Sequence, residues 1–95
     1  FKIFILRWIR LYTKGQVVYS KCGRDKRRPF IIFGLDDEFL YLVDGELRKL
    51  EKPKKKKKKH VQIVNKIDYN IKEKLDENLY LLDADIRKAL EPFKI

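Results

Sequence analysis

A cluster of basic residues around one glycine is the part of this sequence best suited to chemistry, and that chemistry is phosphate binding. Residues 21–28 read KCGRDKRR, so Gly23 is surrounded by lysines and arginines. A glycine lets the backbone turn without obstruction by a Cβ, which leaves amide groups able to approach an anion. Arginine forks bind phosphate bidentately and stack on unpaired bases, so Arg24, Arg27 and Arg28 are expected to make the specific contacts.

The loop also contains an acidic residue, Asp25, and a cysteine, Cys22. Asp25 is expected to organise the turn or to pair with a neighbouring basic side chain, because a carboxylate repels phosphate. The alternative interpretation of residues 21–28 is a basic hairpin that is merely solvated. Cys22 lies in the same loop, but no histidine base is visible beside it to activate its thiol.

A second basic element follows at residues 52–60, which read KPKKKKKKH. Like charges in such a run repel one another and resist burial, so we expect a solvated loop or tether. Lysine ammonium groups do not discriminate sequence, and the run is therefore expected to raise affinity and association rate without selecting a site. The alternative is an extension that becomes ordered along RNA strands. His60, at its end, is a candidate phosphate contact.

Groups suited to catalysis or metal binding are few. The chain has a single cysteine, Cys22, and a single histidine, His60. One cysteine excludes an internal disulfide, and one histidine leaves no set of metal-ligand spacings. The carboxylate pair Asp36 and Asp37 lies in turn-like sequence, where solvent exposure explains it. We therefore expect no enzyme, no catalytic residue, no metal and no cofactor, in a reducing, cytoplasmic setting.

Length and charge narrow the class of partner. The 95 residues suit one domain, and 40% of them are charged, with a formal net charge of +10. Residues 1–67 carry 19 Lys and Arg against 7 Asp and Glu, whereas residues 68–95 carry 5 against 7. A positive field confined to the first two-thirds attracts polyanions, of which nucleic acid is the usual one. Anionic membrane is the competing possibility.

Short strands separated by turns are expected to position the basic elements. Alternating or β-branched runs predict strands at 16–21, 29–33, 39–43, 46–50 and 61–67. Asp44-Gly45, between the third and fourth runs, is typical of a two-residue type I′ hairpin. The aromatic residues of these runs are expected to lie mostly in the core. Alternation assigns Phe39, Tyr41 and Val43 to one face and Leu40 and Leu42 to the other, and one of the two faces is expected to be exposed or covered by the helical tail. Five strands in this space predict a mainly β fold, a small SH3-like barrel.

The C-terminal sequence predicts one or two short helices packed on the barrel. Asp68 is placed to cap a helix with Ile71 and Leu75 on one face, and Asp83 to cap DADIRKAL before Pro92. The second helix is expected to face the barrel through Ile86, Ala89 and Leu90. The chain thus divides into an extension at 1–13, a barrel at 14–67 with its polylysine loop at 52–60, and a helical tail at 68–95.

The first stretch, FKIFILRWIRLY, is apolar with interspersed basic residues but too short to span a bilayer as a helix. We expect an extension that packs on the barrel or is loosely ordered; an interfacial membrane helix is the alternative. The sequence has no methionine and begins at Phe1, so we expect the translational start to be missing or processed away and residues 1–13 to be an extension that need not be native.

The segment KGQVVYSKCGRDKRRPFIIF resembles the KOW motif, a strand-loop-strand unit with a fixed glycine that occurs in ribosomal proteins and transcription elongation factors. Gly23 stands where that glycine belongs. Together with VDGELRKLEKPKKKKKKH and NKI, the chain is similar over roughly residues 15–90 to short bacterial KOW-domain RNA-binding proteins, near the fourteen-e family of large-subunit ribosomal proteins. The resemblance implies an SH3-like barrel that binds ribosomal RNA.

One position departs from the family. Members commonly carry a second glycine four residues after the first, where this chain has Arg27. If that position requires a positive φ, arginine costs about 1 kcal/mol or more relative to glycine, so either the loop has rearranged or the strain is tolerated.

We therefore expect the chain to be an RNA-binding protein of the large ribosomal subunit, structural or accessory, and monomeric when free. The alternatives are a transcription-factor-type KOW module that binds a protein partner, and a peripheral binder of anionic membrane. The residues expected to contact RNA share positive charge or loop geometry: Lys21, Gly23, Arg24, Lys26, Arg27, Arg28, Lys52, Lys54, Lys55, Lys56, Lys57, Lys58, Lys59, His60 and Lys66.

Overall fold

The computed structural model describes residues 12–94. The expected N-terminal extension at 1–13, apart from Tyr12 and Thr13, lies outside the described residues, and so does any membrane helix built from it. Within the part that is described, no helix combines the length and apolar character needed to cross a membrane.

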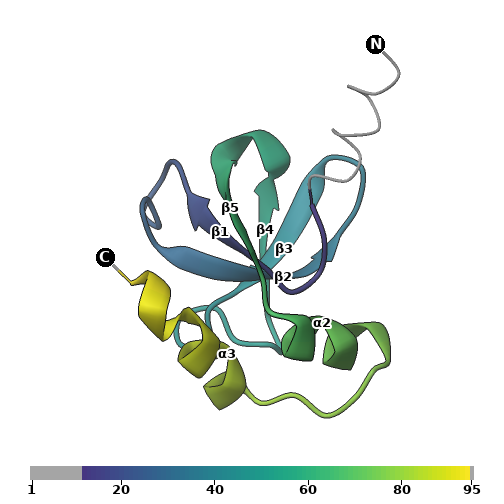
Figure 1. The fold of residues 1–95 in the computed structure, drawn as a ribbon. Coiled ribbons are helices and arrows are strands. Elements are labelled where there is room, and N and C mark those ends of the chain that lie inside the picture. Colours follow the sequence, from purple (N-terminus) through teal and green to yellow (C-terminus); the bar gives the residue numbers. More distant parts are fainter. Residues whose placement is uncertain (1–11, 95) are drawn as a thin grey trace.

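Five antiparallel strands form one strongly curved sheet (Figure 1), which confirms the predicted mainly β, SH3-like barrel. The strands are β1 (Gln16–Ser20), β2 (Pro29–Leu35), β3 (Phe39–Val43), β4 (Lys54–Lys57) and β5 (Val61–Ile67). Their order in the sheet is β4-β3-β2-β1-β5, and a short 3-10 helix, η1 (Lys58–His60), joins the two edge strands. The edges of the sheet are therefore consecutive in the chain.

The sheet has a core on both of its faces, because successive residues of a strand point to opposite sides. In β1, Val18 packs inside the barrel with Phe30, Leu40 and Leu42, while Val17 packs on the outer face. Both valines are at most 1% exposed. Strands buried on two sides remove more apolar surface from water than strands of a half-solvated sheet, and this burial stabilises a small domain.

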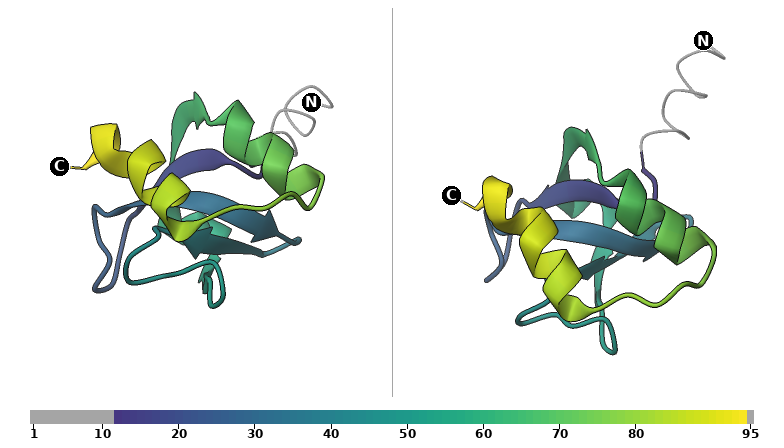
Figure 2. Two further views of the ribbon diagram at one scale, coloured as in Figure 1. Left: turned by 90° about the horizontal axis from the view of Figure 1, so that it is seen from below. Right: turned by 60° about the horizontal axis from the view of Figure 1, so that its bottom comes forward.

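Two helices cover the outer face of the sheet (Figure 2): α2 (Tyr69–Asp76) and α3 (Asp83–Leu90), which ends in the 3-10 turn η2 (Glu91–Phe93). The predicted cap of α2 is confirmed, since the Asp68 carboxylate accepts a hydrogen bond from the Ile71 amide at 3.1 Å. Ile86 and Leu90 of α3 are buried against the sheet, as predicted, with Ala89 packed beside them.

The predicted capping role of Asp83 is wrong. Leu82 is the N-cap residue of α3, and its amide donates to the Asp85 carboxylate at 3.0 Å. The Asp83 carboxylate instead accepts a hydrogen bond from the Leu50 amide at 2.8 Å, which ties the start of the helix to the segment before β4.

The predicted strand at 46–50 and the type I′ hairpin at Asp44-Gly45 are also wrong. After β3 the Asp44 carboxylate accepts hydrogen bonds from the amides of Glu46 at 2.9 Å and Arg48 at 2.8 Å, so this side chain organises a loop rather than a two-residue turn. Gly45 has a φ of +77°, and a Cβ there would lie 2.4 Å from the Asp83 carbonyl oxygen of α3. The loop is shaped by its contact with α3, which the local sequence does not reveal.

The fourth strand is the polylysine run, so the prediction of a solvated loop at 52–60 is wrong. Leu40 pairs with Lys56 and Leu42 with Lys54 across an antiparallel ladder. Strand β3 supplies hydrogen-bonding partners, and the alternation of a strand sends adjacent ammonium groups to opposite sides. Edge position suits lysine, because charged side chains there discourage pairing with other chains.

Candidate nucleic-acid interface

The Gly23 loop, residues 21–28, is a tight structure held by its own backbone. The Lys26 amide donates to the Gly23 carbonyl at 3.2 Å, and the Arg28 amide donates to the Asp25 carbonyl at 2.9 Å. The Arg27 amide returns to the Ser20 carbonyl of β1 at 2.8 Å. Gly23 has a φ of +80°, which fits its predicted role as the residue that lets the backbone turn.

Arg27 has a φ of +71°, so it occupies left-handed backbone that a glycine would adopt without strain. An L residue with a long side chain costs about 1–2 kcal/mol in this conformation. Of the two possibilities weighed from sequence, tolerated strain therefore describes this position. Residues held in such backbone conformations cluster at functional sites, where surrounding structure compensates for the strain.

Two lysines of β4 point toward the Gly23 loop and hold it. Lys56 is only 8% exposed, and its ammonium group donates to the Cys22 carbonyl oxygen at 2.9 Å. Lys54 forms an ion pair and a hydrogen bond with the Asp25 carboxylate, which confirms that Asp25 pairs with a basic side chain. Charge-assisted hydrogen bonds of this kind are among the stronger ones in proteins. The loop is thus clamped to β4 by side chains.

The electrostatics of Asp25 follow from this clamp. Partial burial acts to raise its pKa, but the hydrogen bond and charge of Lys54, with Arg48 and Lys56 nearby, outweigh burial and hold the pKa below its ordinary value. Asp25 therefore remains a carboxylate within a basic loop. It neutralises Lys54 rather than presenting negative charge to a ligand.

The alternate lysines of β4 face away from the loop. Lys55 and Lys57 are exposed, and the Lys55 ammonium lies 4.2 Å from the centroid of the Phe39 ring, a cation–π contact across the two strands. Phe39 and Tyr41 are partly exposed on this side, as the predicted alternation allowed. Strand β4 therefore has an inward pair of lysines, Lys54 and Lys56, which hold the loop, and an outward pair, Lys55 and Lys57, which are exposed.

The clamp brings the two predicted basic elements into one surface. At the end of β1 the Lys21 amide donates to the His60 carbonyl of η1 at 2.8 Å, so η1 also adjoins the loop. Seven cations are exposed on the Gly23 loop, on the outward side of β4 and on η1: Lys21, Arg24, Lys26, Arg27, Lys55, Lys57 and Lys59. We call these seven residues the basic surface.

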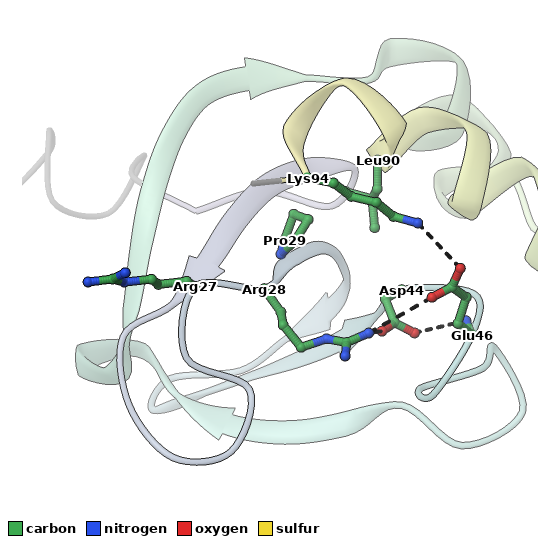
Figure 3. A pocket seen from close by; sticks show the side chains of 7 residues that line it. All are labelled: Arg27, Arg28, Pro29, Asp44, Glu46, Leu90 and Lys94. Carbon is green, nitrogen blue, oxygen red and sulfur yellow. Dashed lines mark hydrogen bonds and ion pairs between the residues drawn. The ribbon is translucent and has the colours of Figure 1, made fainter.

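Other predicted contact residues are placed differently. Arg28 is turned to the opposite side of the loop (Figure 3), where its guanidinium lies 3.2 Å from the Asp44 carboxylate and 3.9 Å from that of Glu46. Lys94 reaches the same Glu46 at 3.3 Å. Acidic partners thus surround Arg28, whereas Arg27 points away from them.

Three further lysines lie at the margins. Lys66 is near the far end of β5, about 16 Å along the strand from Val61 at the loop, given about 3.3 Å per residue. Lys52 is exposed in the turn before β4, and Lys58 is partly buried with its ammonium 5.4 Å from the Tyr12 ring centroid. We do not include these three lysines in the basic surface.

A hollow beside the loop includes three residues that were not among the predicted RNA contacts: Tyr19, Ser20 and Gln62. Its lining comprises Tyr19, Ser20, Lys21, Lys26, Arg27 and Gln62. Tyr19 and Gln62 are directly opposite each other in the β1–β5 ladder. Sequence reasoning missed Gln62 because it lies far from the loop in the chain; predicting the β1–β5 register would have found it.

Among residues 12–94, no group of His, Cys, Asp and Glu side chains is arranged to hold a metal ion. Comparison with models of protein families finds no match to the chain, and comparison with curated proteins finds no relative.

Proposed function

We propose that this protein binds structured RNA through the basic surface. The observation that carries the proposal is the clamp between β4 and the Gly23 loop, which joins two cation-rich segments that lie far apart in the chain. Each phosphate neutralised by such a surface releases condensed counterions, which is the main source of affinity for nucleic acid. Arg24 and Arg27 add guanidinium forks suited to phosphate geometry.

The uneven distribution of charge along the chain supports the same function. The helical segment 68–95 carries a net charge of −2, so the positive field is confined to the barrel and would orient the protein on a polyanion. The resemblance to KOW-domain proteins makes ribosomal RNA of the large subunit the RNA class that we propose. The protein would act there as a structural or accessory component and not as an enzyme.

Matched charge removal tests this proposal. Arg24→Gln with Lys26→Gln removes two charges from the basic surface, and Lys74→Gln with Lys88→Gln removes two from the helices. We expect the first pair to weaken binding to a large-subunit ribosomal RNA fragment by tenfold or more, on the order of 1.4 kcal/mol. The helical pair should change affinity far less. Equal losses would mean that only net charge matters, and the proposed surface would be wrong.

A protein partner is the second candidate function, and a specific observation favours it. The linker between α2 and α3 exposes Leu79, Tyr80 and Leu82, with Tyr80 81% exposed. An adjoining hollow is lined by apolar side chains including Phe33 and Leu50. Exposed apolar residues that lie together are typical of protein contacts.

Gradient sedimentation separates the two functions. Migration with large ribosomal subunits that is lost after nuclease treatment supports RNA binding. Association with polymerase or another protein that survives nuclease, and is lost on Leu79→Ser with Tyr80→Ser, would support the protein-binding module instead.

A further inference from the structure

The hollow lined by Tyr19, Ser20, Lys21, Lys26, Arg27 and Gln62 combines an aromatic ring, a hydroxyl and an amide side chain with three cations. It encloses about 540 Å³ and opens to solvent at the end of the barrel where the Gly23 loop leaves β1. Sites for small molecules commonly enclose about 300–1,000 Å³. The hollow is therefore large enough for one nucleotide and too small for a duplex.

One wall of the hollow carries an aromatic ring beside an amide. Because Tyr19 and Gln62 are cross-strand partners, their side chains lie on the same face of the sheet. The Tyr19 hydroxyl donates to the Phe93 carbonyl oxygen at 2.6 Å, which fixes the position of the ring. The Gln62 side chain is exposed and forms no hydrogen bond with residues 12–94. Stacking on an aromatic ring and hydrogen bonding to a base edge are the two ways proteins read unpaired bases.

The rim of the hollow is cationic. Lys21, Lys26 and Arg27 are exposed, and none of them pairs with a carboxylate of the described residues 12–94. No acidic residue lines this hollow, in contrast to the one around Arg28, which contains Asp44 and Glu46. Of the two adjacent arginines, Arg28 pairs with Asp44 and Glu46, whereas Arg27 points away from both carboxylates (Figure 3).

The backbone of Arg27 is a separate indication of a ligand. Its φ of +71° would be unstrained for glycine, yet an arginine stands there and lines the hollow. Strain of this kind persists where the side chain has a use that depends on the position.

We propose that this hollow binds one unpaired nucleotide of the RNA, with its base against Tyr19 and Gln62 and its phosphate between Lys21, Lys26 and Arg27. The proposal rests on the RNA-binding function and specifies what that function recognises: a bulged or looped nucleotide within a structured RNA. The duplex on either side contacts the rest of the basic surface.

Three RNAs that differ at one position test this proposal: a perfect duplex, the same duplex with a single bulged nucleotide, and the bulged duplex with an abasic site at the bulge. The four bulged bases are compared separately. Base stacking on an aromatic side chain is worth about 1–3 kcal/mol, so the best bulged RNA should bind about 5-fold to 150-fold more tightly than the perfect duplex. The abasic RNA, which keeps the flexibility and phosphates of the bulge, should lose this preference.

Variants locate the effect on the protein. Gln62→Ala should reduce the preference for the bulged RNA several-fold and leave affinity for the perfect duplex unchanged. Asn65→Ala, at another exposed position of β5, is the matched control and should change neither. If wild-type protein binds bulged, abasic and perfect duplexes equally, the nucleotide site is wrong and RNA binding stands. If none of the three RNAs binds more tightly than heparin does, the proposed function fails as well.

Discussion

The ammonium group of Lys56 donates a hydrogen bond to the carbonyl oxygen of Cys22 at 2.9 Å, and so joins the edge strand β4 to the Gly23 loop. Within residues 12–94, β4 pairs through its backbone with β3 alone. The barrel is therefore closed at this seam by lysine side chains, with Lys54 and Asp25 as the second contact. Two of the four lysines of β4 have oxygen partners on the Gly23 loop, which offsets the repulsion between the charges of the strand.

The division of β4 into inward and outward lysines predicts two different phenotypes for the same loss of charge. Lys54→Thr with Lys56→Thr removes both hydrogen bonds of the clamp and should lower the free energy of unfolding by roughly 3 kcal/mol or more, since hydrogen bonds of charged groups contribute about 1.5–3 kcal/mol each. Lys55→Thr with Lys57→Thr should leave stability nearly unchanged, because threonine suits an exposed strand position. Chemical denaturation measures both, and equal destabilisation would contradict the division.

The outward pair should act on binding instead. Each lysine that contacts a phosphate contributes about 0.7–0.9 to the slope of log affinity against log salt. Replacing Lys55 and Lys57 should flatten that slope, as measured by RNA titrations at several salt concentrations. An unaltered slope would show that these lysines do not contact RNA.

The clamp should also weaken in acid. The pKa of Asp25 is lowered in the folded protein, so ionised Asp25 stabilises the fold fully above its ordinary value of 3.8 and loses that contribution as the pH falls through the lowered value. Asp25→Asn should therefore cost about 1 kcal/mol at neutral pH and progressively less below pH 4. Unfolding of the two proteins across this pH range is the measurement. A difference that stays constant with pH would rule out the Lys54 ion pair as its cause.

Arg27 should show a trade-off between stability and binding. Arg27→Gly relieves the strained backbone and is expected to raise the free energy of unfolding by about 1 kcal/mol, while weakening binding to RNA. Arg27→Asn, which tolerates left-handed backbone better than most residues, is the intermediate control. A variant that is both less stable and unchanged in affinity would refute the role given to Arg27.

The two glycines Gly23 and Gly45 should differ sharply on substitution by alanine. Both have a positive φ, but a Cβ at Gly45 would lie 2.4 Å from the Asp83 carbonyl oxygen, whereas at Gly23 the nearest atom outside its neighbours is the Lys56 ammonium at 3.7 Å, an ordinary contact distance. Gly23→Ala should cost about 1 kcal/mol from backbone strain, and Gly45→Ala about 2–3 kcal/mol, since α3 must shift as well. Thermal unfolding of both variants checks this, and similar losses would mean that α3 does not pack on the loop.

The sequence predicted those features that depend on local pattern. Alternation located β1, β2, β3 and β5, and the apolar spacing of Ile86 and Leu90 identified the face of α3 that packs on the sheet. The strand at Lys54–Lys57 was out of reach, because lysine has a low strand propensity and the run is ordered by β3 and by the Cys22 carbonyl. For the same reason, the sequence could not separate Arg27 from Arg28: their difference arises from Asp44 and Glu46 across the fold.

The central claim is that the Gly23 loop and the lysine strand form a single RNA-binding surface. An NMR titration of the ¹⁵N-labelled protein with a large-subunit ribosomal RNA fragment tests it most directly. Amide resonances of residues 21–28 and 54–60 should shift together along one binding curve, while those of α2 and α3 stay in place. Shifts confined to one of the two segments, or centred on the linker at residues 77–82, would contradict it.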